Sequence, residues 1–189
     1  MENQKLSLAE LKNSAMSFDR AESRDVHVVK GEDDYLCKRV MGVWNLDKNT
    51  LACLGPKNYA VIQHRQAVES VVEALTSLNI KGAAEIKTST HGVFIDLDFP
   101  EACVELKEVG EKFIAGIRVV SDYSQVAGLQ ISPRLVRLAC SNGMLVTEIV
   151  RAQRIKYTEE LHITVEGIID KIIKDLISSD EKLANMVSV

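Results

Sequence analysis

Three segments in the middle of the chain alternate apolar and polar residues with the period of two that β-strands require. They span residues 83–88, 93–99 and 113–120. Pro100 is expected to end the second segment, and residues 101–111 read as an acidic connection to the third. Successive strands joined by short segments usually pair with one another as an antiparallel meander. The sequence therefore predicts an α+β protein with a mostly antiparallel sheet.

Helical periodicity flanks these strands on both sides. Residues 1–25 repeat apolar side chains at intervals of three and four, and Ser7 followed by Glu10 is the signature of a capping box. Stronger apolar stripes predict helices over 65–78 and 164–177. We expect residues 1–25 to form an N-terminal helical arm and residues 26–189 a single α+β domain. The flanking N-terminal and C-terminal helices are expected to pack on one face of the sheet.

A β-hairpin is predicted between the N-terminal helix and the next one. Residues 26–29, 35–44 and 50–54 read as short strands separated by turn-forming residues. Trp44, the only tryptophan, is expected to anchor a core or an interface, with base stacking as the alternative. Gly55-Pro56 then ends this region.

Composition indicates a soluble globular protein. The chain has 189 residues, 46% hydrophobic and 26% charged, with a net charge of −4. It contains no apolar run long enough to span a bilayer and no signal-peptide pattern at its start, so we expect a cytoplasmic protein with no membrane partner. Its four widely spaced cysteines lack the paired spacing of a zinc site. No cofactor is predicted.

Two carboxylates are candidates for a metal site. Asp96 and Asp98 lie two residues apart in a predicted strand, so their side chains share one face. With Asp122 they would supply the oxygen ligands of a divalent ion. The alternative is a solvated outer face of the sheet. His64, at the start of the helix predicted over 65–78, is expected to be a structural histidine with its hydrogen bonds satisfied.

A basic segment follows the third strand in an otherwise acidic chain. Pro133 opens a short segment in which two arginines three residues apart would share one side of a helical turn. Asn142-Gly143 forms a turn whose backbone N–H groups suit an anion. This pattern is consistent with contacts to nucleic acid, or with an arginine-rich contact to an acidic part of a neighbouring subunit. The candidate binding residues are Arg134, Arg137, Arg151, Arg154, Lys156, Asn142 and Gly143.

Several segments resemble a family of phage and plasmid proteins, domain of unknown function 932. The resemblance covers about residues 57–150, and its most specific part is the Arg137-Leu-Ala-Cys-Ser-Asn-Gly-Met segment. The other segments are Tyr59-Ala-Val-Ile-Gln-His, His91-Gly-Val-Phe-Ile-Asp-Leu, Ala115-Gly-Ile-Arg-Val and Ser121-Asp-Tyr-Ser. The resemblance implies residence on a virus, plasmid or integrated element, and it implies no established activity or catalytic residue.

These observations predict a non-enzymatic, oligomeric nucleic-acid-binding protein of a mobile element, with single-stranded nucleic acid as a candidate ligand. One alternative is a metal-dependent enzyme acting on phosphodiesters through Asp96 and Asp98. The sequence offers this enzyme no phosphate-binding loop, catalytic triad or metal motif. A second alternative is a structural or scaffold protein whose function is assembly itself.

Overall fold

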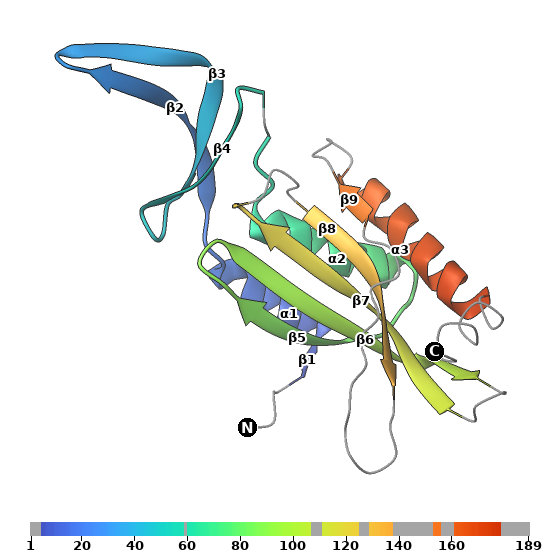
Figure 1. Ribbon diagram of the computed structural model, residues 1–189. Coiled ribbons are helices and arrows are strands. Elements are labelled where there is room, and N and C mark those ends of the chain that lie inside the picture. The colour runs from blue at the N-terminus through green and yellow to red at the C-terminus, as the bar shows by residue number, and fades with distance from the viewer. Residues whose placement is uncertain are drawn as a thin grey trace.

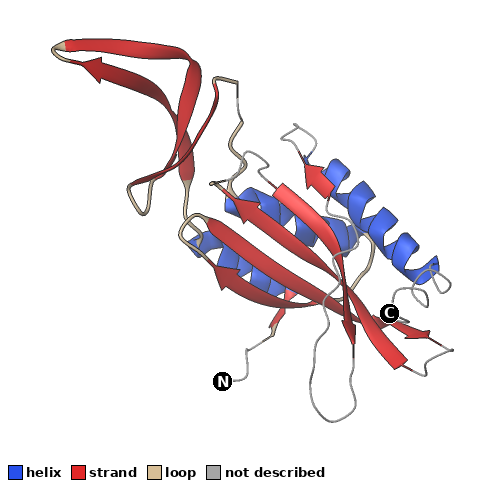
Figure 2. Cartoon of the chain, viewed as in Figure 1, coloured by secondary structure: helices blue, strands red, loops and turns tan. Residues whose placement is uncertain are grey.

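The computed structural model describes residues 5–58, 60–106, 111–124, 129–137, 153–155 and 161–178. Within them the chain forms two antiparallel sheets together with helices, which confirms the α+β class (Figure 1). The larger sheet has the order β1-β5-β6-β7-β8-β9 and the smaller one β2-β3-β4. Figure 2 shows the smaller sheet projecting away from the body that the larger sheet and the helices form.

The strands of the larger sheet are β1 (Leu6–Ser7), β5 (Ala83–Thr88), β6 (Gly92–Leu106), β7 (Glu111–Asp122), β8 (Leu129–Arg137) and β9 (Gln153–Ile155). The smaller sheet consists of β2 (Ala21–Lys30), β3 (Asp33–Asn45) and β4 (Thr50–Pro56). The helices are α1 (Leu8–Ser14), the short 3-10 helix η1 (Ala15–Ser17), α2 (His64–Ser77) and α3 (Leu161–Ser178). None of these helices combines the length and the apolar character needed to cross a membrane.

The main core lies between the larger sheet and the helices. Every second residue along β6 and β7 is apolar and is buried there. The apolar stripes of α2 and α3 and Leu11 of α1 pack against these side chains. The predicted helix over 65–78 is confirmed as α2, and Asn79, with φ of 55°, takes the left-handed conformation that commonly follows a helix. The capping box at Ser7 and Glu10 is also confirmed.

Two boundaries differ from the prediction. Pro100 does not end its strand, because β6 continues to Leu106 across a register shift between Asp98 and Cys103 that accommodates the missing N–H. The N-terminal helix is shorter than predicted, since α1 ends at Ser14 and residues 21–30 are β2. Leu11 and Ala15 are buried in the main core, so the N-terminal helical segment is part of the body.

We call the smaller sheet, residues 21–56, the β-arm. The β-arm buries few apolar side chains: its core cluster comprises Ala21, Val43 and Tyr123, and Tyr123 comes from the body. β3 pairs with β4 only over residues 40–45. The outer part of the arm, which we call the tip, is therefore a two-stranded hairpin of β2 and β3, and its turn contains Gly31 with φ of 67°. A two-stranded hairpin is marginally stable by itself in water.

Candidate functional site: the β-arm and its root

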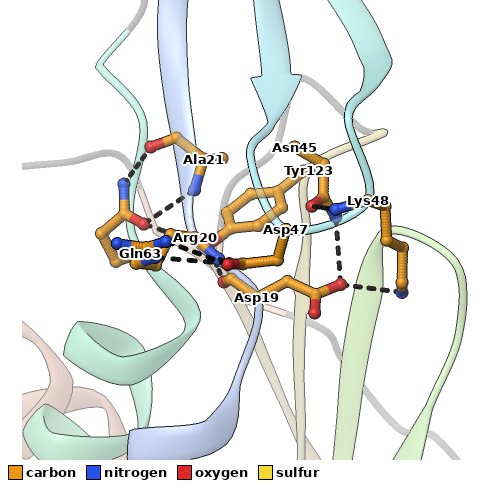
Figure 3. A network of polar contacts seen from close by, with 8 residues as sticks. All are labelled: Asp19, Arg20, Ala21, Asn45, Asp47, Lys48, Gln63 and Tyr123. Atoms are coloured by element: carbon orange, nitrogen blue, oxygen red, sulfur yellow. Dashed lines mark hydrogen bonds and ion pairs between the residues drawn. The ribbon is translucent and has the colours of Figure 1, made fainter.

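Buried polar groups join the β-arm to the body at one place, which we call the root (Figure 3). The hydroxyl of Tyr123 accepts a hydrogen bond from the His64 backbone N–H at 3.1 Å and donates one to the carbonyl oxygen of Asp19 at 2.9 Å. Burial raises the pKa of Tyr123 to about 12, so the hydroxyl keeps its proton and acts as both donor and acceptor. Tyr123, from the Ser121-Asp-Tyr-Ser segment at the end of β7, is thus part of a structural joint.

The side chain of Gln63 extends the joint to the first residue of β2. Its Oε1 accepts from the Ala21 N–H at 3.0 Å, and its Nε2 donates to the Ala21 carbonyl at 2.6 Å. The Gln63 amide thus makes the same pair of hydrogen bonds to Ala21 that a residue of an adjacent strand would make. Gln63 is also the N-cap of α2, so the start of β2 is fixed directly to the start of that helix.

Charged side chains close the other side of the root. The Asp19 carboxylate accepts from Asn45 Nδ2 at 3.1 Å and pairs with Lys48 Nζ at 2.7 Å. Partial burial acts to raise the pKa of Asp19, but the hydrogen bonds from Lys48 and Asn45 outweigh it and lower that pKa. Lys48 also donates to the carbonyls of Ser89 and Thr90, at 3.0 and 2.7 Å, and so ties the β3–β4 turn to the β5–β6 turn.

His64 is the buried histidine of the root. Its ring stacks on Tyr123 with centroids 3.7 Å apart, and its Nδ1 lies 2.7 Å from Ser121 Oγ. Burial lowers the pKa of His64 to about 4, although the nearby carboxylate of Asp19 acts in the opposite direction. A serine hydrogen-bonded to a neutral histidine is the geometry of an activated nucleophile. Here His64 is 1% and Ser121 2% exposed, so no substrate reaches the pair, and the structural role predicted for His64 is confirmed.

Asp96 and Asp98 share a face as predicted, but both carboxylates are only 6% exposed, so they are not the solvated charges of an outer face. Arg118 donates two hydrogen bonds to Asp96, at 2.6 and 2.8 Å, and Arg134 bonds to Asp98 and lies 3.7 Å from Asp96. Lys5 Nζ adds an ion pair to Asp98 at 3.0 Å. Burial acts to raise the pKa of Asp96, but the two guanidinium groups outweigh it and lower that pKa.

Asp122 does not join these carboxylates. It lies opposite Gly92 in the β6–β7 pairing, whereas Asp96 lies opposite Arg118, four residues away along the strand. Four residues correspond to roughly 13 Å. In the part of the chain that the structure describes, no three acidic, histidine or cysteine side chains are grouped so as to hold a metal ion. The predicted metal-dependent site is therefore not assembled by these residues.

Arg134 requires a correction. It was expected on a helical turn and available to a ligand, but residues 129–137 form the strand β8 and Arg134 is only 6% exposed. Its guanidinium serves internal carboxylates, because a buried charge is stable only when it is paired. Arg137 ends the same strand, and Arg154 lies in β9 opposite Gln130. The other candidates, Arg151, Lys156, Asn142 and Gly143, lie outside the described residues.

The exposed surface of the β-arm is the feature that the sequence did not single out. Among the described residues, eight large hydrophobic side chains are exposed, and six of them belong to the β-arm. These six are 45–72% exposed, and they are Val28, Val29, Tyr35, Leu36, Leu51 and Leu54. Clustering of exposed apolar side chains on one element marks an interaction surface more often than a free surface.

The root residues Asp19, Asn45 and Gln63 were also missed, because single polar residues carry no periodic signal. The Gln63–Gln66 spacing is the one local signal that could have indicated Gln63, since the structure shows a capping box there. No family model, curated protein or solved structure matches the chain.

Proposed function

We propose that this chain is a non-enzymatic assembly protein that self-associates through its β-arm. The observation that carries this proposal is the concentration of exposed hydrophobic side chains on a projecting sheet with almost no core of its own. Covering these side chains with another protein surface would supply the apolar burial that the arm lacks. The resemblance of residues 57–150 to mobile-element proteins supports a place on a virus or plasmid, acting in the cytoplasm.

The test is a pair of substitutions on strand β2 of the β-arm, Val28→Ser with Val29→Ser. Each removes about 1.5 kcal/mol or more of apolar burial from an interface, so the apparent dissociation constant should rise at least tenfold. Light scattering coupled to size-exclusion chromatography measures the mass at several concentrations. The matched control is Met16→Ser with Ile163→Ser, which alters exposed hydrophobic residues outside the arm. An equal loss of association in both variants would contradict a specific role for the β-arm.

A second candidate function, binding of nucleic acid, is supported by the polar face of the larger sheet. This face carries the exposed Lys87 and the half-buried Phe94 and Arg118, and Arg154 has its register position beside them, opposite Gln130. We take the N-terminal and C-terminal helices to cover the opposite face. Basic side chains beside a partly exposed aromatic ring suit single-stranded nucleic acid, although Arg118 and Lys87 also pair with Asp96 and Glu85. Arg137, Arg151, Arg154 and Lys156 remain the proposed phosphate contacts, with the Asn142-Gly143 turn.

Fluorescence anisotropy with labelled single-stranded oligonucleotides at increasing salt tests this second function. We expect the logarithm of affinity to fall linearly with the logarithm of salt concentration, and Arg154→Ala to reduce the slope by about one. Lys171→Ala, on the outside of α3, should leave the slope unchanged. Binding that is absent at low salt, or a slope that both variants reduce equally, would contradict the assignment.

A further inference from the structure

The described sheets have four edge strands, and β2 is the longest of them; in the tip, β3 is also unpaired on its outer side over residues 33–38. In the larger sheet the edges are β1 and β9, which have two and three residues. In the β-arm, β4 has seven residues and ends in Gly55-Pro56, whereas β2 has ten residues and contains neither glycine nor proline. Short strands, proline and β-bulges are common means of preventing edge-to-edge pairing. β2 is long and has no proline, and the register shift between Asp25 and His27 places its extra residues, 37–40, on β3, so β2 itself stays continuous there.

The outward backbone groups of β2 can be identified from its two ends. At the root, the N–H and C=O of Ala21 point away from β3, because the Gln63 side chain binds both. At the tip, Lys30 and Asp33 close a two-residue turn, so Lys30 is hydrogen-bonded toward β3. Alternation from either end gives the same result: Ser23, Asp25, His27 and Val29 direct their N–H and C=O groups outward. No backbone hydrogen bond from these groups to another described residue completes the edge.

We propose that the free edge of β2 pairs with β2 of a second copy of this chain, antiparallel, about a two-fold axis at Val26. This inference rests on the proposed self-association and names its contact. Asp25 would exchange backbone hydrogen bonds with His27 of the second copy, and Ser23 with Val29 of the second copy. The result is a continuous six-stranded sheet across two β-arms, in which the outward groups of both edge strands are satisfied.

Charge complementarity selects this register. With the axis at Val26, Glu22 lies opposite Lys30 of the second copy, which is the main charge pair of this register. Asp25 lies opposite His27, but within its own chain Asp25 already pairs with Lys57 and His27 with Asp34. Moving the axis to Asp25 places two Asp25 carboxylates opposite each other. Moving it to His27 places Arg24 opposite Lys30 of the second copy. Like charges directly opposite are destabilising in a sheet, and opposite charges are stabilising, so both neighbouring registers are worse.

A charge exchange between two variants tests the register. The first variant carries Glu22→Lys, and the second carries Lys30→Glu. Each variant alone places like charges opposite each other, so its self-association should weaken at least tenfold, as measured by sedimentation velocity. An equimolar mixture restores opposite charges at every pair and should form heterodimers as stable as the wild-type dimer. Variants that still self-associate normally, or a mixture that stays monomeric, would overturn the proposal.

A cross-link tests the axis independently of charge. In a chain with Cys37, Cys53, Cys103 and Cys140 replaced by serine, Val26→Cys should give a disulfide-linked dimer under mild oxidation. A non-hydrogen-bonded antiparallel pair has Cα atoms about 4.5 Å apart, within disulfide range. Val28→Cys is the control, because its counterpart would lie roughly 13 Å away. A dimer that does not cross-link at Val26 would overturn this contact but leave self-association intact, whereas a protein monomeric at every concentration would overturn both.

Discussion

Replacing Arg134 with methionine should lower the free energy of unfolding by about 3–5 kcal/mol. Methionine fills much of the same space, but it leaves the carboxylate of Asp98, 6% exposed, without its buried partner. Lys5 alone remains beside Asp98, and that lysine is largely exposed to solvent. Removing one member of a buried ion pair costs far more than the pair itself contributes, because the remaining charge is desolvated and unpaired. Urea denaturation followed by circular dichroism measures the change.

Two controls separate this effect from the loss of any ion pair. Lys81→Ala removes the exposed pair with Glu101 and should change stability by less than about 1 kcal/mol. Adding Asp98→Asn to Arg134→Met removes the unpaired charge and should recover a large part of the loss. If Arg134→Met were as mild as Lys81→Ala, the buried ion-pair cluster between β6 and β8 would be contradicted.

Acidification should destabilise the wild-type protein more than a His64→Gln variant. The pKa of His64 is lowered from 6.5 to about 4 by burial, so the folded protein does not take up the proton that the unfolded chain binds below pH 6.5. The stabilisation is complete above pH 6.5 and is lost progressively as the pH falls toward 4. Between pH 7 and pH 5 this difference amounts to about 2 kcal/mol.

The measurement is the free energy of unfolding of both proteins at pH 7, 6 and 5. His64→Gln lowers stability at pH 7 through its altered contact with Ser121, so the comparison is the slope with pH and not the absolute value. Carboxylates titrate equally in both proteins and cancel in the difference. Equal slopes would show that His64 is protonated in the folded state and that its site in the root is open to water.

Local patterns in the sequence were sufficient to predict the central strands and the long helices, but not the strand β8, where a helical turn is expected from the sequence. The period of two in residues 93–99 and the period near 3.6 in residues 65–78 report which side chains face a core, and both elements form as predicted. The capping box at Ser7 depends on a single turn of chain. Pro100 was misleading because a register shift in the sheet, which depends on the partner strand, accommodates it.

The partners of charged residues could not be predicted in the same way. Strand alternation correctly placed Asp96 and Asp98 on one face, but the arginines that neutralise them come from strands 22 to 38 residues further along the chain. The root likewise joins Asp19, Asn45, Gln63 and Tyr123 from four separate segments. The sequence of residues 21–56 does not indicate that these strands project from the body. Their alternation of apolar and polar residues is compatible with a sheet packed on the body and with a projecting one.

Sedimentation velocity of the unmodified 189-residue chain over a hundredfold range of concentration is the most direct test of assembly through the β-arm. We expect the sedimentation coefficient to rise with concentration from that of a 20.9 kDa monomer to that of a dimer or larger species. The Val28→Ser, Val29→Ser variant should require at least tenfold more protein to reach the same value. A wild-type protein that sediments as a monomer throughout this range would contradict assembly as its function.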